Sequence, residues 1–490
     1  MLMTDYDVVV MGAGVAGLGL GARLKARGQH DFLVLERAAE VGGTWRDNTY
    51  PGCACDVPSH LYWYSFDEEP PDWSRIYPSQ GEVFARLREF AERTGVLGHV
   101  RLNTRVVAAD WDEADLHWRV TTADGGTITA RVFVSACGQL AEPSYRGIAG
   151  RERFTGVSFH SARWRHDVDL TGKRVACVGS GASAAQLIPE IAAVAAKLTV
   201  FQRSAPYVLP REDRPYTEAE LRAFREDPEA LAKSRAEQYA ERERQFWALE
   251  PGSDVARETV RIAREHLEAQ VADPVLREKL WPGYAFGCKR PVISDEYLPA
   301  FTRPNVDLVT AGVAGVEPDG VRDATGALHP VDVIVYSTGF ESLKFLNGLR
   351  VTGRGGTDLH EQAWRESPQA YLGMAVPGFP NFFILYGPNT NLNHNSIIAM
   401  LEAQYDYLLQ AFARLGPDAP ALDVRPEVVA AYNDRLQQDL ARSAFATGCS
   451  SWYVGEGGRV VTNWWGTVDA YKARTARFDP AEYRTVGSPA

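Results

Sequence analysis

The chain contains one strand, glycine turn, helix, strand unit twice, and this repetition restricts its fold more than any other sequence feature. The first copy covers residues 7–28 with a second strand over 31–37, and the second covers 173–195 with a strand over 198–204. In each copy a short β-branched run precedes a glycine-rich turn and an Ala/Leu-rich segment. This pattern is typical of a buried parallel strand followed by a helix. Two such units predict an α/β protein with two Rossmann-like dinucleotide-binding domains.

Two apolar runs and one polar region complete the expected domain order. Residues 130–139 and 331–340 are apolar runs that end in a small residue and glycine, as expected for the return strand of each domain. The region between Pro210 and Tyr284 is rich in Arg, Glu and Ala and poor in β-branched residues, which favours a helical insertion. We therefore expect a first domain over 1–145 and 371–490, a second over 146–209 and 286–370, and an insertion over 210–285.

In the first copy, three glycines and one carboxylate have the spacing of a dinucleotide fingerprint. Gly12 allows the tight turn, Gly14 lets the backbone approach a pyrophosphate, and Gly17 lets the helix pack closely on the strand. The free N–H groups and the dipole at the helix N-terminus favour the negative charge. Glu36 ends the next strand, where a carboxylate binds a ribose diol and repels a 2′-phosphate. This site is predicted to bind FAD or NAD(H) rather than NADP(H).

The second copy has a different residue at the end of its second strand. Its turn contains Gly179 and Gly181, followed by Ser183 and by Ala184 in the third glycine's place. Arg203 stands where the carboxylate would be, and its planar donor fork suits a phosphate. This site is predicted to bind NADP(H). A protein that holds two dinucleotides, one of them reducing, is a flavin oxidoreductase. We therefore assign FAD to the first domain and NADPH to the second.

Composition argues against several other classes of protein. The net charge of −11 and the pI of about 5.5 do not fit a non-specific nucleic-acid binder. No window approaches the ~18 consecutive apolar residues of a membrane span. The first expected strand begins at Tyr6, which leaves no room for a signal peptide.

The six cysteines are sparse and show no C-x2-C spacing. We therefore expect neither a disulfide framework nor a metal site, and a reducing cytoplasm as the location. Cys53 and Cys55 form a C-x-C pair, which is a weak signal for redox chemistry.

The segment FTGVSFHSARW, residues 154–164, resembles the fingerprint of type I Baeyer–Villiger monooxygenases, the relatives of flavin-containing monooxygenases. Phe154, Gly156, His160 and Trp164 occupy its fixed positions in F-x-G-x-x-x-H-x-x-x-W. N- and S-oxidising flavin-containing monooxygenases usually carry Tyr or Phe in place of this tryptophan. The next residue is Arg here, where the family usually has Pro or Asp.

Three further segments are similar to the same family. Residues 42–56, GGTWRDNTYPGCACD, fit G-G-x-W-x4-Y-P-G-x3-D completely and end in Asp56. Residues 287–291, GCKRP, contain the Lys–Arg pair that the family uses at its active site. Residues 387–398, GPNTNLNHNSII, resemble a flavin-contacting turn. The resemblance runs from Met3 to about Tyr471.

The resemblance implies roles for individual residues. Arg290 would stabilise negative charge during oxygenation, Asp56 would orient Arg290, and His160 completes the expected catalytic set. Beyond the first glycines, the expected FAD contacts are Glu36, Gly43, Thr44, Trp45, Tyr62, Val106 and Asn389. Lys289 and Arg203 would hold the 2′-phosphate with help from Ser204. His160 and Trp164 would set the position of the NADP domain.

The implied reaction inserts one oxygen atom from O2 next to a ketone carbonyl through a flavin C4a-peroxide and gives an ester or lactone. An N- or S-oxygenase of the same superfamily is the alternative, against which Asp56 and Trp164 argue. A redox-sensing or binding flavoprotein with no substrate is a further alternative, but in such a protein Arg290 and Asp56 would have no role. A disulfide reductase would need a C-x4-C pair, which the sequence lacks. The sequence leaves open which ketone is used and how many subunits assemble.

Overall fold

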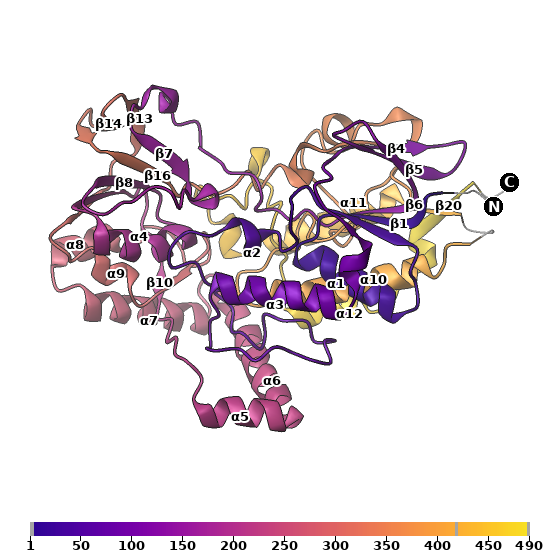
Figure 1. Ribbon diagram of the computed structural model, residues 1–490, viewed down its shortest axis with the longest axis horizontal. Helices are drawn as coiled ribbons and strands as arrows, with labels where there is room; N and C mark the ends of the chain where they lie inside the picture. The colour runs from indigo at the N-terminus through magenta and orange to yellow at the C-terminus, as the bar shows by residue number, and fades with distance from the viewer. Residues whose placement is uncertain (1–3, 417–419, 488–490) are drawn as a thin grey trace.

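The first glycine unit forms the centre of an eight-stranded mixed sheet in the computed structural model, which describes residues 4–416 and 420–487 (Figure 1). The strand order is β17-β4-β5-β6-β1-β2-β3, and β18 pairs with β6. β1 lies parallel to β2 and β6, and Val8, Val9 and Val10 are fully buried. Val8 and Val10 pack with helical residues such as Leu18 and Tyr405, and Val9 packs on the other face with strand and loop residues such as Trp118 and Leu349. Both faces of this strand are therefore covered, which explains why it is apolar throughout. The elements are β1 Tyr6–Met11, α1 Val15–Ala26, β2 Phe32–Leu35, β3 Val100–Arg101, β4 Val106–Asp112, β5 His117–Thr122, β6 Thr127–Ser135, β17 Arg350–Thr352 and β18 Phe382–Ile384.

The second glycine unit forms a five-stranded parallel sheet in the order β12-β9-β8-β16-β7. A small antiparallel sheet, β13-β14-β15, lies beside it. The elements are β7 Val157–His160, β8 Arg174–Val178, α4 Ala182–Val194, β9 Lys197–Phe201, β12 Val306–Val309, β13 Val313–Glu317, β14 Gly320–Asp323, β15 Leu328–Pro330 and β16 Val333–Tyr336. Two parallel-strand units of this kind confirm the predicted fold class.

The region between Pro210 and Tyr284 contains helices α5 Glu218–Glu226, α6 Pro228–Gln245, α7 Asp254–Gln270 and α8 Pro274–Leu280. α5 and α6 lie below the two sheets in Figure 1. Arg235 of α6 donates to the carbonyl oxygens of His60 and Trp63 in the first unit. Leu267 of α7 packs into the core of the second unit. The helical segment therefore contacts both dinucleotide units.

One expected boundary is wrong. The second domain is expected to extend to residue 370, but β17 already pairs with β4 of the first sheet. Leu346, Gly348 and Leu349 line a cavity of the first unit. The chain therefore returns to the first unit at about residue 345. The sequence does not reveal this return, because β17 is too short to stand out as a strand.

The remaining helices and strands mostly cover the first sheet. Buried residues of α1, α3 and α10 share one apolar core. The elements are α2 Thr44–Asp47, α3 Gln80–Arg93, β10 Val208–Leu209, β11 Val292–Ile293, α9 Tyr297–Ala300, α10 Ile397–Phe412, β19 Ala421–Val424, α11 Pro426–Leu440, α12 Val468–Thr475 and β20 Tyr483–Val486. Within the described ranges, none of the helices has the length and apolar character to cross a membrane.

One disulfide bond departs from the sequence-based expectation. Cys288 and Cys449, 161 residues apart, form a disulfide next to Lys289 and Arg290. The other four cysteines are free. The expectation of no disulfide framework is therefore wrong for this one pair, since cysteine spacing alone does not reveal a contact between distant segments. The bond ties the GCKRP loop to the loop that follows α11.

We expect the Cys449→Ser variant to unfold at a lower temperature than the wild type, because the lost bond closes a long loop. A typical disulfide contributes about 2–4 kcal/mol of unfolding free energy. Thermal unfolding measured with and without a reductant tests this. Reductant should lower the unfolding temperature of the wild type toward that of the variant and leave the variant unchanged. An unfolding temperature of the wild type that does not change with reductant would contradict the presence of the disulfide.

Candidate active site

A cavity of about 310 Å³ lies at the carboxyl ends of β1, β2 and β6. In parallel sheets this edge is where dinucleotides bind. Eight of the residues predicted to contact FAD line the cavity: Gly12, Gly14, Glu36, Gly43, Thr44, Trp45, Tyr62 and Val106. The return strand contributes Ala136, Cys137 and Gly138 to the same wall. The structure thus brings together residues that the sequence separates widely.

The start of α1 has the geometry of a phosphate-binding turn. Gly14 precedes the helix, and no side chain caps the first N–H groups. Gly12 has φ +108°, and a Cβ there would lie 2.7 Å from the carbonyl oxygen of Ala136. A Cβ on Gly17 would lie 1.9 Å from the carbonyl oxygen of Gly12. Uncapped N–H groups beside a closely packed glycine turn fit a pyrophosphate.

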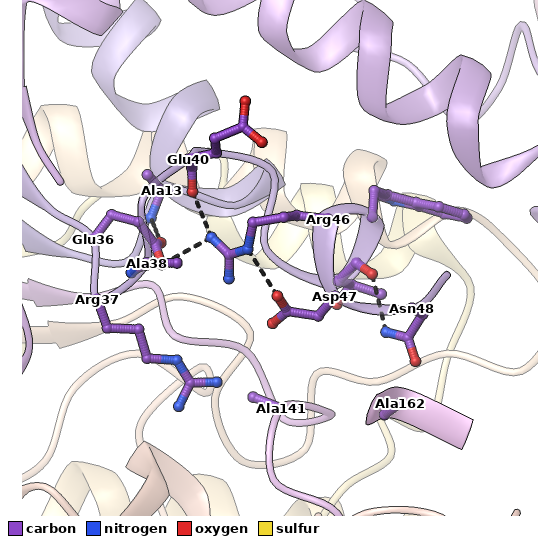
Figure 2. Close-up of polar contacts among 12 residues, drawn as sticks. Ala13, Glu36, Arg37, Ala38, Glu40, Arg46, Asp47, Asn48, Ala141 and Ala162 are labelled. Atoms are coloured by element: carbon purple, nitrogen blue, oxygen red, sulfur yellow. Dashed lines mark hydrogen bonds and ion pairs between the residues drawn. The ribbon is translucent and has the colours of Figure 1, made fainter. Parts of the chain in front are cut away.

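Glu36 is held in place by three hydrogen bonds at the cavity wall (Figure 2). Its carboxylate accepts from the N–H groups of Ala13 and Ala38 at 2.9 and 3.0 Å. The third donor is Nη1 of Arg46 at 3.0 Å, and Nε of Arg46 donates to Asp47 at 2.7 Å. Sequence reasoning missed Arg46, although it directly follows Trp45 in the GGTW segment. Arg46 therefore helps to fix the carboxylate of Glu36, a residue that lines the cavity.

The start of α4 repeats this arrangement in the second unit. Gly181 precedes the helix without a side-chain cap, and Gly179 has φ +125°. A Cβ on Gly179 would lie 2.1 Å from the carbonyl oxygen of Ser337. Ala184 is fully buried against the strand, and Ser183 lies in the first helical turn beside Tyr50. This helix start has the same open N–H groups as α1.

Three cations gather near the end of β9. Nζ of Lys289 donates to Oγ of Ser204 at 2.7 Å. Burial, together with the charges of Arg203 and Arg146, lowers the pKa of Lys289. Nε of Arg146 donates to the carbonyl oxygen of Thr338 at 2.7 Å. Among the described residues, these three side chains form no ion pair with a carboxylate. A cluster of unpaired cations favours an anionic ligand.

Arg146 is a member of this cluster that the sequence analysis did not identify. Burial and the Arg203 guanidinium lower the pKa of Arg146. It stands in the segment between the first return strand and the His160 fingerprint, where no motif marks it. Only the folded chain places it next to Arg203.

Arg290 and Asp56 form an ion pair across 234 residues of sequence. Nη2 and Nε of Arg290 donate to Oδ2 of Asp56 at 2.6 and 3.2 Å. Nη1 donates to the carbonyl oxygen of Leu392 at 3.0 Å, so both sides of the guanidinium are held. Burial acts to raise the pKa of Asp56, but the charge and hydrogen bonds of Arg290 together with the Arg242 charge outweigh it, and the pKa is lowered. The Asp56 carboxylate raises the pKa of Arg290 above its usual value. Both groups are therefore charged at neutral pH.

His160 and Trp164 lie away from this pair, at the edge of the second sheet. His160 ends β7 beside Tyr336 and is 1% exposed. Its Nδ1 accepts from the N–H of Ala162 at 3.1 Å, and its ring packs edge-on against Tyr145 and Phe340. Burial lowers the pKa of His160 to about 4, which leaves it neutral near pH 7. Tyr145 and Phe340 belong to the two segments that connect the dinucleotide units.

Trp164 packs edge-on against Phe159, with ring centres 5.0 Å apart, on the core of the second unit. Because Phe159 directly precedes His160, Trp164 lies in the same region of the chain as His160. The prediction that both residues set the position of the second unit is consistent with these contacts and stays a prediction.

Asn389 has a structural contact that the sequence analysis did not anticipate. Its Nδ2 donates to the carbonyl oxygens of Val460 and Asn463 at 2.9 and 3.0 Å. The residue thus holds the turn over 387–398 against the C-terminal loop. Its predicted contact with FAD stays a prediction. Nearby, Tyr386 and Gln139 line the cavity, and Nε2 of Gln139 donates to the carbonyl oxygen of Tyr386 at 2.8 Å.

The described residues contain one group with metal-ligand spacing, Asp112, Asp115 and His117, in the β4–β5 hairpin. Asp112 already accepts hydrogen bonds from the N–H groups of Ala114 and Asp115 and pairs with Arg119. The Asp112 carboxylate is therefore already engaged, and the expectation of no metal site stays a prediction.

Comparisons with known proteins show the family of this chain. The model of the family described as flavin-binding monooxygenase-like matches residues 5–221. A Baeyer–Villiger monooxygenase of Streptomyces coelicolor is 42% identical over 482 residues, covering 98% of this chain and 92% of that protein. One from Pseudomonas aeruginosa is 40% identical with the same coverage.

Solved structures give the same result. A steroid monooxygenase bound to NADP has a TM-score of 0.86 and 33% identity, covering 99% of this chain and 100% of that one. A complex of OTEMO with FAD and NADP has a TM-score of 0.88 and 28% identity, covering 98% and 99%.

The chain therefore belongs to the Baeyer–Villiger monooxygenases of the flavin-binding monooxygenase-like family. It is an NADPH-dependent flavin monooxygenase that uses FAD, as the two dinucleotide sites predict.

Proposed function

We propose that this enzyme oxygenates a ketone to an ester or lactone, with O2 and NADPH as co-substrates. The observation that carries the proposal is the Arg290–Asp56 ion pair, in which the guanidinium is held on both sides. When bound, FAD supplies the activation of O2. The residues of the chain bind the two dinucleotides, hold the reacting groups and stabilise charge.

The first cavity would hold FAD through residues of three kinds. The open N–H groups of α1 suit the pyrophosphate, and Glu36 suits the ribose diol. Trp45 and Tyr62 line the same cavity and pack edge-on against each other, with ring centres 5.5 Å apart. The start of α4 would hold the second pyrophosphate, and Lys289, Ser204 and Arg203 would hold the 2′-phosphate, with Arg146 as a further cation.

Arg290 is proposed to stabilise the negative charge that develops on oxygen as the ketone carbonyl is attacked. A guanidinium stays protonated throughout, so Arg290 acts by charge and hydrogen bonding and transfers no proton. Asp56 and the Leu392 carbonyl fix its plane before the reaction, which removes the cost of reorienting it. His160 and Trp164 would keep the NADP unit at the distance from the flavin that the reaction requires.

A substrate panel tests the proposed reaction. The purified enzyme would receive NADPH, O2 and cyclic, linear, aromatic or steroidal ketones, with amines and sulfides as the comparison. NADPH consumption and product mass would be measured. We expect at least one ketone to gain one oxygen atom and to consume NADPH stoichiometrically. Oxidation of amines or sulfides alone would favour the alternative of an N- or S-oxygenase.

Location and macromolecular partners stay predictions. The free thiols of Cys53, Cys55, Cys137 and Cys177 fit the proposed reducing cytoplasm, whereas the Cys288–Cys449 disulfide does not. The acidic net charge of −11 supports the proposal that nucleic acid is not a partner.

Arg203→Ala is expected to raise the KM for NADPH roughly ten- to a hundredfold, because one charge-assisted phosphate contact contributes about 1.5–3 kcal/mol. The KM for NADH should change little, since NADH lacks the 2′-phosphate. Steady-state kinetics with both cofactors measures this. Arg222, an exposed arginine of α5, gives the control variant Arg222→Ala, which should alter neither value. An equal loss with both cofactors for Arg203→Ala would remove Arg203 from the phosphate site.

A further inference from the structure

One side chain of the NADP unit is hydrogen-bonded to the loop that carries Asp56. Nε2 of Gln186, on α4, donates to the carbonyl oxygen of Ala54 at 2.9 Å. Its Oε1 accepts from the hydroxyl of Tyr50 at 2.9 Å and from the N–H of Ala54 at 3.4 Å. The amide therefore pairs with both backbone groups of Ala54, two residues before Asp56.

The loop and the helix are in close backbone contact at this point. Gly52 has φ +76°, and a Cβ there would lie 2.6 Å from the carbonyl oxygen of Gln186. The positive φ and the close approach to the Gln186 carbonyl both require a glycine at position 52. The loop is also fixed on its other side, since the N–H of Cys55 donates to the carbonyl oxygen of Pro78 and Arg211 donates to the carbonyl oxygen of Cys55. The loop is thus held by α4 on one side and by Pro78 and Arg211 on the other.

Gln186 lies between the second dinucleotide site and the segment that leads to the Asp56–Arg290 ion pair. One turn earlier on α4 are Ser183 and the open N–H groups of the second dinucleotide site. Ser183 also lies beside the Tyr50 hydroxyl that Gln186 binds. On the other side, Ala54 leads directly to Asp56 and hence to Arg290. Neither the glycine motif nor the GGTW segment assigns a role to this glutamine.

We infer that Gln186 is a positioning residue, which transmits the placement of the NADP-binding helix to Asp56 and so to the Arg290 guanidinium. The inference rests on the proposed function. Gln186 does not touch the ion pair itself, so it acts through the loop of residues 50–56. With NADP bound at the start of α4, the Ala54 contact would hold Asp56 where it orients Arg290.

The first test uses Gln186→Leu, which keeps the size of the side chain and removes its hydrogen bonds. The FAD content and the Kd for NADP+ should stay within about threefold of the wild type. The unfolding temperature should stay within a few degrees. Ester formed per NADPH consumed should fall about tenfold, with the remainder appearing as hydrogen peroxide, because three hydrogen bonds to the loop are lost. The effect should fall on kcat more than on KM. Unchanged coupling would overturn the inference.

The matched control is His166→Ala. His166 Nε2 and the hydroxyl of Thr49 form another contact between the two units, at 2.8 Å, but farther along the loop from Asp56. This variant should retain the coupling of the wild type. The same loss in both variants would mean that any contact between the units matters, and would overturn the specific role of Gln186.

Gln186→Glu supplies a pH-dependent test. A carboxylate can accept from Tyr50 and from the Ala54 N–H but cannot donate to the Ala54 carbonyl, whereas a protonated carboxyl can. Coupling in this variant, relative to the wild type at each pH, should be poor at pH 8 and should recover as pH falls and the carboxyl becomes protonated. A purely structural role would give no such recovery, so a flat ratio would contradict the inference.

One readout is independent of the ketone reaction. Binding of NADP+ to the oxidised enzyme should change the flavin absorption spectrum of the wild type and of His166→Ala. In Gln186→Leu we expect the change to be lost while the Kd for NADP+, measured by calorimetry, is retained. A full spectral change in Gln186→Leu would overturn the inference. Failure of every ketone to react, with the spectral result as expected, would overturn the proposed function alone.

Discussion

Replacing Arg290 with alanine is expected to abolish ester formation almost completely while NADPH still reduces the flavin. Reduction needs only the alignment of the two dinucleotides, which we assign to other residues. Oxygenation needs the held guanidinium, and loss of one preorganised charge donor costs about 3–4 kcal/mol in its step, or 10²–10³ in rate. Stopped-flow reduction by NADPH, followed by quantification of ester and hydrogen peroxide, measures both steps. Nearly all the NADPH consumed should appear as hydrogen peroxide.

Asp56→Ala is the companion variant, with a milder form of the same defect, because Arg290 would stay charged and keep only its contact with the Leu392 carbonyl. Arg290→Lys should not restore activity, since an ammonium cannot donate to Asp56 and Leu392 with the same planar geometry. Normal ester formation by Arg290→Ala would remove this residue from the mechanism.

Gly12→Ala is expected to yield protein that lacks bound FAD. The added Cβ would lie 2.7 Å from the Ala136 carbonyl oxygen, at a backbone φ of +108°. A left-handed conformation costs a non-glycine residue about 1–2 kcal/mol before any steric contact is counted. The turn must shift, and the pyrophosphate site shifts with it, so FAD affinity should fall by at least about tenfold.

The ratio of flavin to protein absorbance after purification measures this loss. Gly81→Ala is the matched control, because Gly81 lies in α3 with open space around its Cα. The control should keep a full complement of FAD, and its helix should be slightly more stable. Equal FAD content in the two variants would contradict the assignment of the first fingerprint.

The two dinucleotide units could be predicted from the sequence because each is local. Strand, glycine turn, helix and strand follow one another within about thirty residues, the usual length of such a unit. The strand-end residues Glu36 and Arg203 distinguish the two sites for the same reason. The return of the chain to the first sheet could not be predicted. β17 has only three residues, Arg350–Thr352, and its partner β4 lies far back in the sequence.

The site was less accessible to sequence reasoning. The pairing of Asp56 with Arg290 followed only from the family resemblance, since spacing carries no information across 234 residues. Arg46, Arg146 and Gln186 occupy no fixed position of a motif, and their hydrogen bonds form only in the folded chain. The Cys288–Cys449 disulfide could not be predicted either, because six sparse cysteines permit many pairings.

Oxygen-isotope labelling tests the central claim most directly. The purified holoenzyme, NADPH and a ketone that supports NADPH consumption would react under ¹⁸O₂, and the product would be analysed by mass spectrometry. We predict an ester or lactone with one ¹⁸O atom at the inserted position, formed in proportion to NADPH consumed. A ketone recovered unchanged with all reducing equivalents in hydrogen peroxide, or label found only in amine or sulfide oxides, would contradict the account.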